Sequence, residues 1–439
     1  MLQSMRKILD AFSQQRLLGG AFVLAVTQFG ASFVGLVRDN VLNRTYPSLG
    51  TVDVYFASFR LSDLLFQMTI MAGLSTVLVP LLSRYKSLDK HEETSALLSS
   101  VMAAGSIAFG AIALLLGIFF PSIAPKLVDF QGEQLELYIL FGRLALFTNF
   151  LFVFGNALGQ YLITVQKYWI YGITPIIYTI GTILGTLLLS SMYGQLAPMM
   201  GTLAGAVIYV AIRMIGCIRM GFHLRGPIWH PDLKDMGWLM LPRMFALGAM
   251  QLQLLVFDSL ASGLDSGSIT INVNARNFQS AVVGIVGIAL AQSAFPLLSN
   301  AAAKGEWERY RIYMRKGVTT VLALTIPGAI ILVLATPIAA RLVHLQSVIN
   351  VFAASLAIYA ISIPFESLNH LLLRSFYALK KTATPAIFNV LNGVIAIAVS
   401  WMLVPRFGVY ALAIGFTAGQ IVQMCGLGLS IRYTKVLNK

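Results

Sequence analysis

Apolar blocks of about 20 residues or more recur along the whole sequence of 439 residues. About 20 residues of α-helix cross the hydrocarbon core of a bilayer, whereas a transmembrane β-barrel uses short segments of alternating polarity. Only 11% of the residues are charged, against about 25% in soluble domains. The sequence therefore predicts an all-α polytopic membrane protein and excludes a soluble, fibrous or disordered chain.

Hydropathy along the chain predicts twelve membrane-spanning helices. They lie near residues 19–43, 52–82, 95–120, 136–164, 168–191, 197–220, 237–262, 268–299, 317–340, 347–378, 383–404 and 408–430. The polar, basic N-terminus has no cleavage site of the signal-peptide type, so we interpret it as a retained cytoplasmic segment. The predicted order is an N-terminal segment at 1–18, a six-helix bundle at 19–220, a cytoplasmic connection at 221–236, a six-helix bundle at 237–430 and a cytoplasmic tail at 431–439.

Lys and Arg are distributed unevenly between the predicted connections. With the N-terminus placed inside, the inside segments hold 21 of them, with Arg213 included, and the outside segments hold 4. Short cytoplasmic loops carry this excess in membrane proteins, so both termini are predicted to be cytoplasmic. The same asymmetry accounts for most of the net charge of +14 and makes a nucleic-acid partner unnecessary.

The two halves of the sequence resemble each other. Pro-Leu-Leu-Ser at 80–83 recurs at 296–299, and the same offset of 216 maps Arg60 onto Arg276. Further matches pair Asp39 with Asp258, Thr174-Pro175 with Thr384-Pro385, and Gly205 with Gly415. Both halves begin inside, so the repeat is parallel. This pattern is typical of transporters in which two bundles enclose a central cavity near the midplane.

Six arginines fall within the predicted spans, and each costs about 2.5–3.5 kcal/mol at the centre of a membrane helix. They are Arg38, Arg60, Arg143, Arg243, Arg276 and Arg374. The intramembrane acids are one fewer: Asp39, Asp53, Asp63, Asp258 and Glu366. A wet cavity rich in arginine suits an anionic substrate, because the guanidinium fork matches phosphate or diphosphate oxygens.

Each arginine also has a structural alternative. Arg60, Arg243 and Arg374 can extend to the interface from helix ends, and Arg143 can pair with Glu133 or Glu136. Neighbours on a helix point about 100° apart, so Arg38 and Asp39 need not pair with each other. We favour a cavity role for Arg38 and Arg276, with Asp39 orienting an arginine.

Motifs of enzymes and of primary pumps are missing from the sequence. It contains neither a GxxxxGK[ST] phosphate loop nor an HExxH or GxSxG motif. Its two cysteines, Cys217 and Cys425, have no metal-binding spacing. We therefore expect a transporter that is not an enzyme, holds no cofactor or metal, and draws energy from an ion gradient, the membrane potential or the substrate gradient.

Several motifs resemble those of the MurJ/MviN family, the lipid II flippases of the multidrug/oligosaccharidyl-lipid/polysaccharide exporter superfamily. The first span contains G-L-V-R-D at 35–39 and the second contains D-V-Y-F-A-S-F-R at 53–60. The eighth contains G-I-V-G-I-A-L at 284–290, and the tenth runs into R-S-F-Y-A-L-K-K-T-A-T-P at 374–385. The resemblance covers essentially the whole chain.

The resemblance implies a cationic cavity that turns an undecaprenyl-diphosphate glycolipid to the outer leaflet of the bacterial inner membrane. It carries over Arg38, Asp39 and Arg276 as the essential charged set, with Asp53 in support. Arg60 and Arg374 complete the candidate substrate-binding residues. Lipid II, membrane lipids and cell-wall synthesis proteins are the implied partners. Some motifs differ from the family pattern, as at Lys381, where an aspartate is usual, and most members have fourteen spans.

The function predicted from these observations is transport of the peptidoglycan precursor lipid II by alternating access. Three alternatives remain open from the sequence: a flippase for another polyprenyl-diphosphate glycan, a multidrug or cation exporter of the same superfamily, and a membrane scaffold that transports nothing. An exporter of cations would want an acid-rich cavity. A scaffold needs no wet cavity and would hold its arginines at interfaces or in closed pairs.

Overall fold

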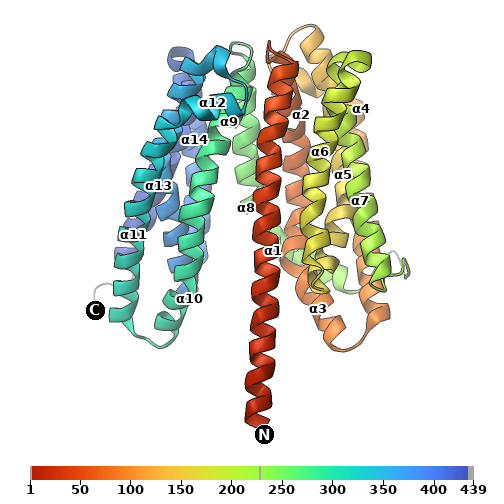
Figure 1. The fold of residues 1–439 in the computed structure, drawn as a ribbon, viewed down its shortest axis with the longest axis vertical. Helices are drawn as coiled ribbons and strands as arrows, with labels where there is room; N and C mark the ends of the chain where they lie inside the picture. Colours follow the sequence, from red (N-terminus) through yellow and green to blue (C-terminus); the bar gives the residue numbers. More distant parts are fainter. Residues whose placement is uncertain (1, 227–228, 434–439) are drawn as a thin grey trace. The chain divides into compact units, whose positions relative to one another are not determined.

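The computed structural model describes residues 2–226 and 229–433, and these residues form helices joined by short turns (Figure 1). The described part of the chain contains no strand, which confirms the all-α prediction. Residues 434–439 of the predicted tail and residues 227–228 of the predicted connection lie outside the described residues.

Fifteen α-helices make up most of the described chain. They are α1 (Leu2–Thr45), α2 (Gly50–Phe66), α3 (Val79–Ser87), α4 (His91–Leu127), α5 (Glu133–Thr164), α6 (Tyr168–Tyr193), α7 (Ala197–Arg219), α8 (Asp232–Ser262), α9 (Ser268–Val282), α10 (Ala289–Ala303), α11 (Trp307–Leu334), α12 (Thr336–Leu342), α13 (Ile349–Ala378), α14 (Ala383–Phe407) and α15 (Tyr410–Tyr433). Short π-helical segments, η1 (Gln67–Met71) and η2 (Leu74–Leu78), join α2 to α3, and η4 (Val283–Ile288) joins α9 to α10.

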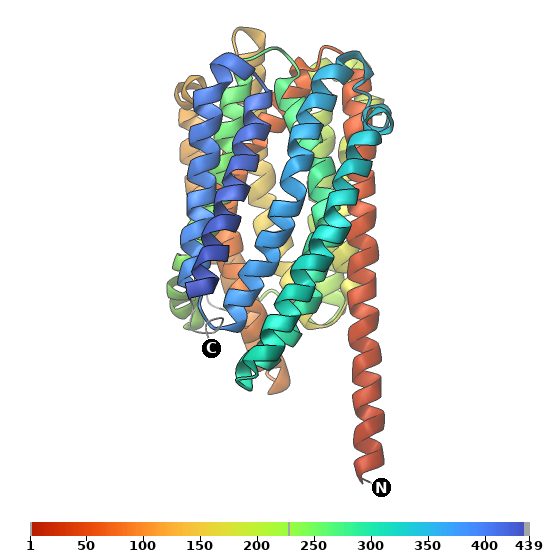
Figure 2. The same ribbon diagram turned by 90° about the vertical axis from the view of Figure 1, so that its left-hand side faces the viewer.

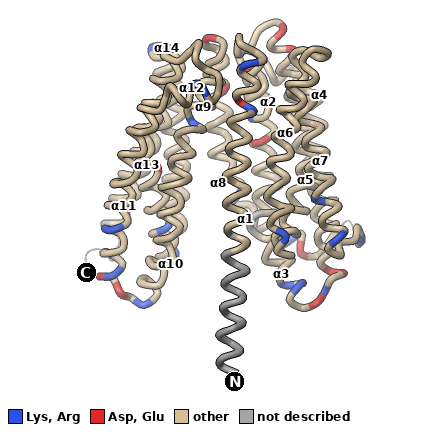
Figure 3. The backbone as a smooth tube through the Cα atoms, in the orientation of Figure 1, with Lys and Arg blue, Asp and Glu red and all other residues tan. Residues whose placement is uncertain are grey.

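Ten stretches of described residues are long and apolar enough to cross a membrane. One of them, Tyr168–Arg219, contains two predicted spans, because α6 and α7 follow each other through a single 3-10 turn. The predicted second span is the run from α2 to α3, which the π segments interrupt. The predicted ninth span at 317–340 is wrong in its bounds: α11 begins at Trp307 and ends at Leu334, and α12 follows separately. Figure 3 shows charged residues mainly toward the ends of the helices.

The chain divides into two compact units. The first contains Met1–Pro47, Leu61–Ala124 and Leu135–Leu247, and the second contains Ser48–Arg60, Pro125–Gln134 and Gly248–Lys439. Two segments of the first half of the sequence, Ser48–Arg60 and Pro125–Gln134, therefore pack within the second unit. The bundles predicted at 19–220 and 237–430 assign both segments to the first bundle instead.

Glycines let α6 and α7 pack closely in the first unit. A Cβ atom on Gly201 would lie 2.6 Å from the Cα atom of Gly185, and one on Gly181 would lie 2.6 Å from the Cα atom of Gly205. Small residues at such contacts allow helix backbones to approach within a membrane. The same unit buries an apolar core to which α3, α4, α5 and α7 contribute, with Leu82, Phe109, Leu158 and Cys217 among its residues.

In the second unit, α10, α11 and α13 surround an apolar core that contains Tyr310, Leu371 and Phe376. The blue helices α14 and α15 lie side by side in Figures 1 and 2. The side-chain amide of Asn392 donates a hydrogen bond of 2.6 Å to Gln423 between them. Interhelical amide bonds of this kind join helices in membranes.

The π-helical segments follow the internal repeat. Segment η1 begins at Gln67 and η4 begins at Val283, which is the offset of 216 found for the Pro-Leu-Leu-Ser motif. Each interrupts the helix before the proline of that motif. Because π segments are rare, their recurrence at equivalent positions supports a common origin of the two halves.

Candidate functional site

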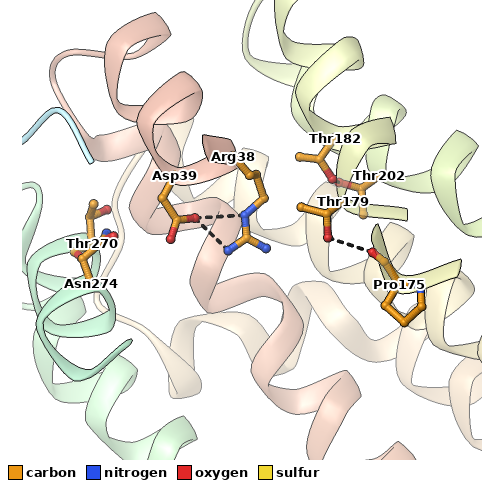
Figure 4. Close-up of polar contacts among 8 residues, drawn as sticks. All are labelled: Arg38, Asp39, Pro175, Thr179, Thr182, Thr202, Thr270 and Asn274. Atoms are coloured by element: carbon orange, nitrogen blue, oxygen red, sulfur yellow. Dashed lines mark hydrogen bonds and ion pairs between the residues drawn. The ribbon is translucent and has the colours of Figure 1, made fainter. Parts of the chain in front are cut away.

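Arg38 and Asp39 form an ion pair within the first unit. The Nε and Nη2 atoms of Arg38 donate to one Asp39 oxygen, at 2.9 and 2.7 Å (Figure 4). Asp39 is 1% exposed, whereas the Arg38 side chain is 23% exposed. The adjacent residues therefore do pair, although helix geometry does not require it, and the buried carboxylate fixes the direction of a partly accessible guanidinium.

Asp53 joins the start of α2 to the start of α9 within the second unit. One carboxylate oxygen accepts hydrogen bonds from the backbone N–H and the hydroxyl of Thr270, at 2.7 and 2.6 Å. The other oxygen accepts the backbone N–H of Gly267 at 2.6 Å. The first turn of a helix has N–H groups without an intrahelical partner, so Asp53 caps α9 from another helix. Both oxygens of this buried group thus have protein partners.

Arg60 pairs with Asp258 of α8, also within the second unit. Its Nε atom donates to the carboxylate at 2.5 Å, and the side chains are 13% and 3% exposed. Arg60 lies in the interior of α2, ten residues after Gly50. The alternative in which it extends from a helix end to the membrane interface is therefore wrong. Asp258 therefore neutralises this partly buried guanidinium.

A polar seam joins α9 to α13. The hydroxyl of Tyr359 donates to Asn272 at 2.6 Å, and the Gln279 amide donates to Glu366 at 2.6 Å and to Ser362 at 3.1 Å. The spacing i, i+3 and i+7 puts Tyr359, Ser362 and Glu366 on one face of α13, and Asn272 and Gln279 share a face of α9.

Arg276 lies between Asn272 and Gln279 on the α9 side of this polar seam. It interacts electrostatically with Asp258, Glu366 and Tyr359, and it is repelled by Arg60. No ion pair formed by the described residues includes Arg276. The two carboxylates near this guanidinium already accept hydrogen bonds, Asp258 from Arg60 and Glu366 from Gln279, which leaves the donors of Arg276 for a ligand.

The remaining candidate arginines are not part of this seam. Arg374 lies near the end of α13, and its Nε atom is buried without a hydrogen-bond partner. Arg243 is exposed on α8, as expected of a residue that extends to the interface. Arg143 donates to the carbonyl of Gly117 at 2.8 Å and forms no ion pair with any described acid, so the suggested pairing with Glu133 or Glu136 is wrong.

Arg213 is a buried arginine inside α7, so its assignment to an inside connection is wrong. It is 1% exposed in α7 and donates to the hydroxyl of Thr174 and the carbonyls of Gly155 and Tyr171, at 2.8, 2.8 and 3.0 Å. Its guanidinium carbon also lies 4.1 Å from the ring centre of Tyr209. The signal was available, because Arg213 lies inside the predicted span at 197–220. The excess of inside basic residues does not depend on it.

Within each unit, an oriented guanidinium group suits recognition of an anion: Arg38 in the first and Arg276 in the second. The carboxylates nearest to these arginines accept hydrogen bonds from protein groups, so they orient cations and do not form an open acidic site. Among the described residues, no group of three or more His, Cys, Asp or Glu side chains is arranged to hold a metal ion.

Comparison with known proteins identifies the family to which the sequence and the fold are similar. The family model described as lipid II flippase MurJ matches residues 49–436. A probable lipid II flippase MurJ of Bdellovibrio bacteriovorus is 22% identical, covering 96% of this chain and 83% of the relative. The lipid II flippase MurJ of Burkholderia cenocepacia is 21% identical, covering 91% of this chain and 80% of the relative.

Solved structures agree on the fold. The structure titled lipid II flippase MurJ, inward closed conformation, matches with a TM-score of 0.80 at 21% identity, over 94% of this chain and 87% of that one. An inward-facing multidrug transporter of the MATE family also matches with a TM-score of 0.80, at 13% identity, over 93% and 96% of the two chains. Because the family model covers most of the sequence and the fold agrees, this chain belongs to the MurJ family of lipid II flippases.

Proposed function

We propose that this protein moves lipid II from the inner to the outer leaflet of the bacterial cytoplasmic membrane by alternating access. The observation that carries the proposal is Arg276, an intramembrane guanidinium that has no ion-pair partner among the described residues and lies on a seam of hydrogen-bonded polar groups. A guanidinium held in this way can donate two parallel hydrogen bonds to a diphosphate. The relatives named as lipid II flippases support a diphosphate lipid as the ligand.

The candidate residues divide into two roles in this proposal. Arg276 of the second unit contacts the diphosphate; Arg38, which Asp39 orients within the first unit, and Arg374 stay candidates from the sequence. Asp53 and Arg60 support the site indirectly, because Asp53 caps α9 and Arg60 is neutralised by Asp258. This assignment changes the role of Asp53 and Arg60 from binding to positioning.

The proposed orientation has both termini in the cytoplasm, since Lys and Arg are concentrated in the connections on that side. Movement of a cationic site across the membrane would also respond to the membrane potential, by about 2.3 kcal/mol per charge for each 100 mV. Cell-wall synthesis proteins are proposed as partners, because they supply and consume lipid II on the two sides of the membrane.

Complementation tests the proposal. A bacterium depleted of its own lipid II flippase would express this chain, Arg276→Ala, Arg38→Ala, or the exposed control Arg243→Ala, at matched membrane levels. Rescue by the wild type and the control, with loss of rescue in the other two variants, is the expected result. Rescue by all four proteins would remove the arginines from the site.

A reconstituted assay separates lipid II from other substrates of the same chemistry. Vesicles containing the purified protein would carry lipid II or an undecaprenyl-diphosphate-linked glycan of another type, and the fraction of headgroup on each leaflet would be measured. We expect faster equilibration of lipid II with the wild type than with Arg276→Ala. Equal transport of both lipids would assign a general polyprenyl-diphosphate flippase, and transport of neither would refute the proposal.

A further inference from the structure

A cavity of about 370 Å³, largely open to its surroundings, lies where the start of α6 meets α1 in the first unit. Its lining comes from Gly19, Gly20 and Val23 of α1, and from the turn and first residues of α6 at 166–169. Gly20 lets the ring of Tyr168 pack against α1, because a Cβ atom there would collide with that ring, whereas a Cβ atom on Gly19 would meet open space. None of these residues belongs to the candidate substrate site.

The polar end of the cavity is formed by a rigid turn. The backbone N–H of Lys167 donates to the carbonyl of Leu162 at 2.8 Å, and that of Gln166 donates to Ile163 at 3.0 Å. The Lys167 side chain is exposed, and none of the ion pairs of the described residues includes it. An ammonium group in this position offers its donors to an anion.

The apolar end continues along α6. Trp169 is 59% exposed, and Ile173, Ile176 and Ile180 follow it at the spacing i, i+4, i+7 and i+11, which defines one helix face. Ile173 and Ile176 are partly exposed, and Ile176 lies beside Gly30 at the edge of the contact with α1. Ile180 is itself exposed. Eleven residues of helix rise about 16 Å, which matches the depth of one leaflet, since the hydrocarbon core is about 30 Å thick.

These features describe the shape of an amphiphile. Tryptophan is enriched at the membrane interface, where its ring spans the boundary between headgroups and chains, and basic pockets between helices bind anionic headgroups. We propose that the α1–α6 cavity is a binding site for an anionic glycerophospholipid, with Lys167 on its phosphate, Trp169 at the glycerol level and the Ile173–Ile180 face along one acyl chain. The site is separate from that of the transported lipid.

Quenching of tryptophan fluorescence by brominated lipid reports on this site directly. The full chain would be placed in nanodiscs of phosphatidylcholine that contain the same fraction of brominated phosphatidylglycerol or brominated phosphatidylcholine. The contribution of Trp169, one of five tryptophans, is the difference between the wild type and Trp169→Phe. We expect phosphatidylglycerol to be enriched about fivefold at Trp169, which corresponds to about 1 kcal/mol for one basic residue near the surface.

Lys167→Gln should abolish the enrichment, whereas Lys90→Gln should retain it, because Lys90 is exposed and does not line the cavity. Equal quenching by the two brominated lipids would overturn the proposal, as would equal effects of the two lysine variants. Displacement by inorganic phosphate, with sodium chloride at matched ionic strength as control, would assign the cavity to a free anion. Displacement by stoichiometric undecaprenyl diphosphate would assign it to the transported lipid. Because the readout is lipid binding, it stands whether or not the chain transports lipid II.

Discussion

Replacement of Asp53 by asparagine separates a structural role of this residue from a role in binding substrate. In the structure, Asp53 accepts three hydrogen bonds from the first turn of α9 and its preceding residue, and it is 4% exposed. An asparagine side chain has one oxygen and one NH₂ group. If its oxygen keeps the two bonds from Thr270, its NH₂ group faces the N–H of Gly267, and two donors then oppose each other.

The expected cost follows from these contacts. A hydrogen bond to a charged group contributes about 1.5–3 kcal/mol, and a buried donor left without a partner costs about 1–3 kcal/mol. Because the asparagine retains part of the network, we expect Asp53→Asn to lower the free energy of unfolding by about 3 kcal/mol. Thr270→Val removes only the hydroxyl bond and should cost about 1.5 kcal/mol. The double variant should cost less than the sum by at least about 0.5 kcal/mol, since the two residues share a network.

Equilibrium unfolding in mixed micelles, by titration with sodium dodecyl sulfate, measures these differences. Asp89→Asn is the matched control: Asp89 is exposed, and its left-handed φ of 53° is one that asparagine tolerates. It should change stability by less than about 0.5 kcal/mol. Transport by Asp53→Asn should fall only as far as its folded amount falls. A variant as stable as the wild type that no longer transports lipid II would refute the capping argument and return Asp53 to the binding site.

Three further predictions concern stability. Gly201→Ala should separate α6 from α7 and lower the free energy of unfolding by about 1–3 kcal/mol in the same titration, because its methyl group meets backbone atoms. Its control, Gly117→Ala, has open space at the Cβ position and should not destabilise the protein. Arg213→Met should cost about 2–4 kcal/mol by leaving buried acceptors unpaired, and a value near zero would contradict the contacts assigned to it. The hydrogen bond to Asp232 raises the pKa of Tyr85 to about 12, so its contribution is complete below pH 10 and is lost as the pH rises to 12; Tyr85→Phe should flatten this part of a stability–pH curve, and an unchanged curve would refute the link.

Hydropathy predicted the helices well because a bilayer leaves the backbone few choices. Lipid offers no hydrogen bonds, so each apolar block must satisfy its own N–H and C=O groups as a helix. The same argument cannot locate interruptions within a helix. The π segments between α2 and α3 and the break between α11 and α12 depend on local packing and carry no hydropathy signal.

The charged residues could be found from the sequence, but their partners could not. An arginine within an apolar block is unfavourable in the membrane, so the sequence indicates that it needs a partner. The sequence does not indicate which residue that partner is. Asp53 contacts residues more than 200 positions away, and Arg60 contacts Asp258 at a separation of 198. Such pairings depend on how Ser48–Arg60 packs within the second unit, which no local pattern encodes.

The internal repeat explains why Arg276, and not its counterpart Arg60, is the better candidate for the diphosphate. In the first half, Asp39 follows an arginine and pairs with it. In the second half, its counterpart Asp258 follows Phe257, so the carboxylate has no neighbouring guanidinium and takes Arg60 instead. Glu366, in turn, accepts its hydrogen bond from Gln279. Equivalent charged residues of the two halves therefore have different partners. Because Asp258 pairs with Arg60, Arg276 is the arginine of the seam whose donors remain for a ligand.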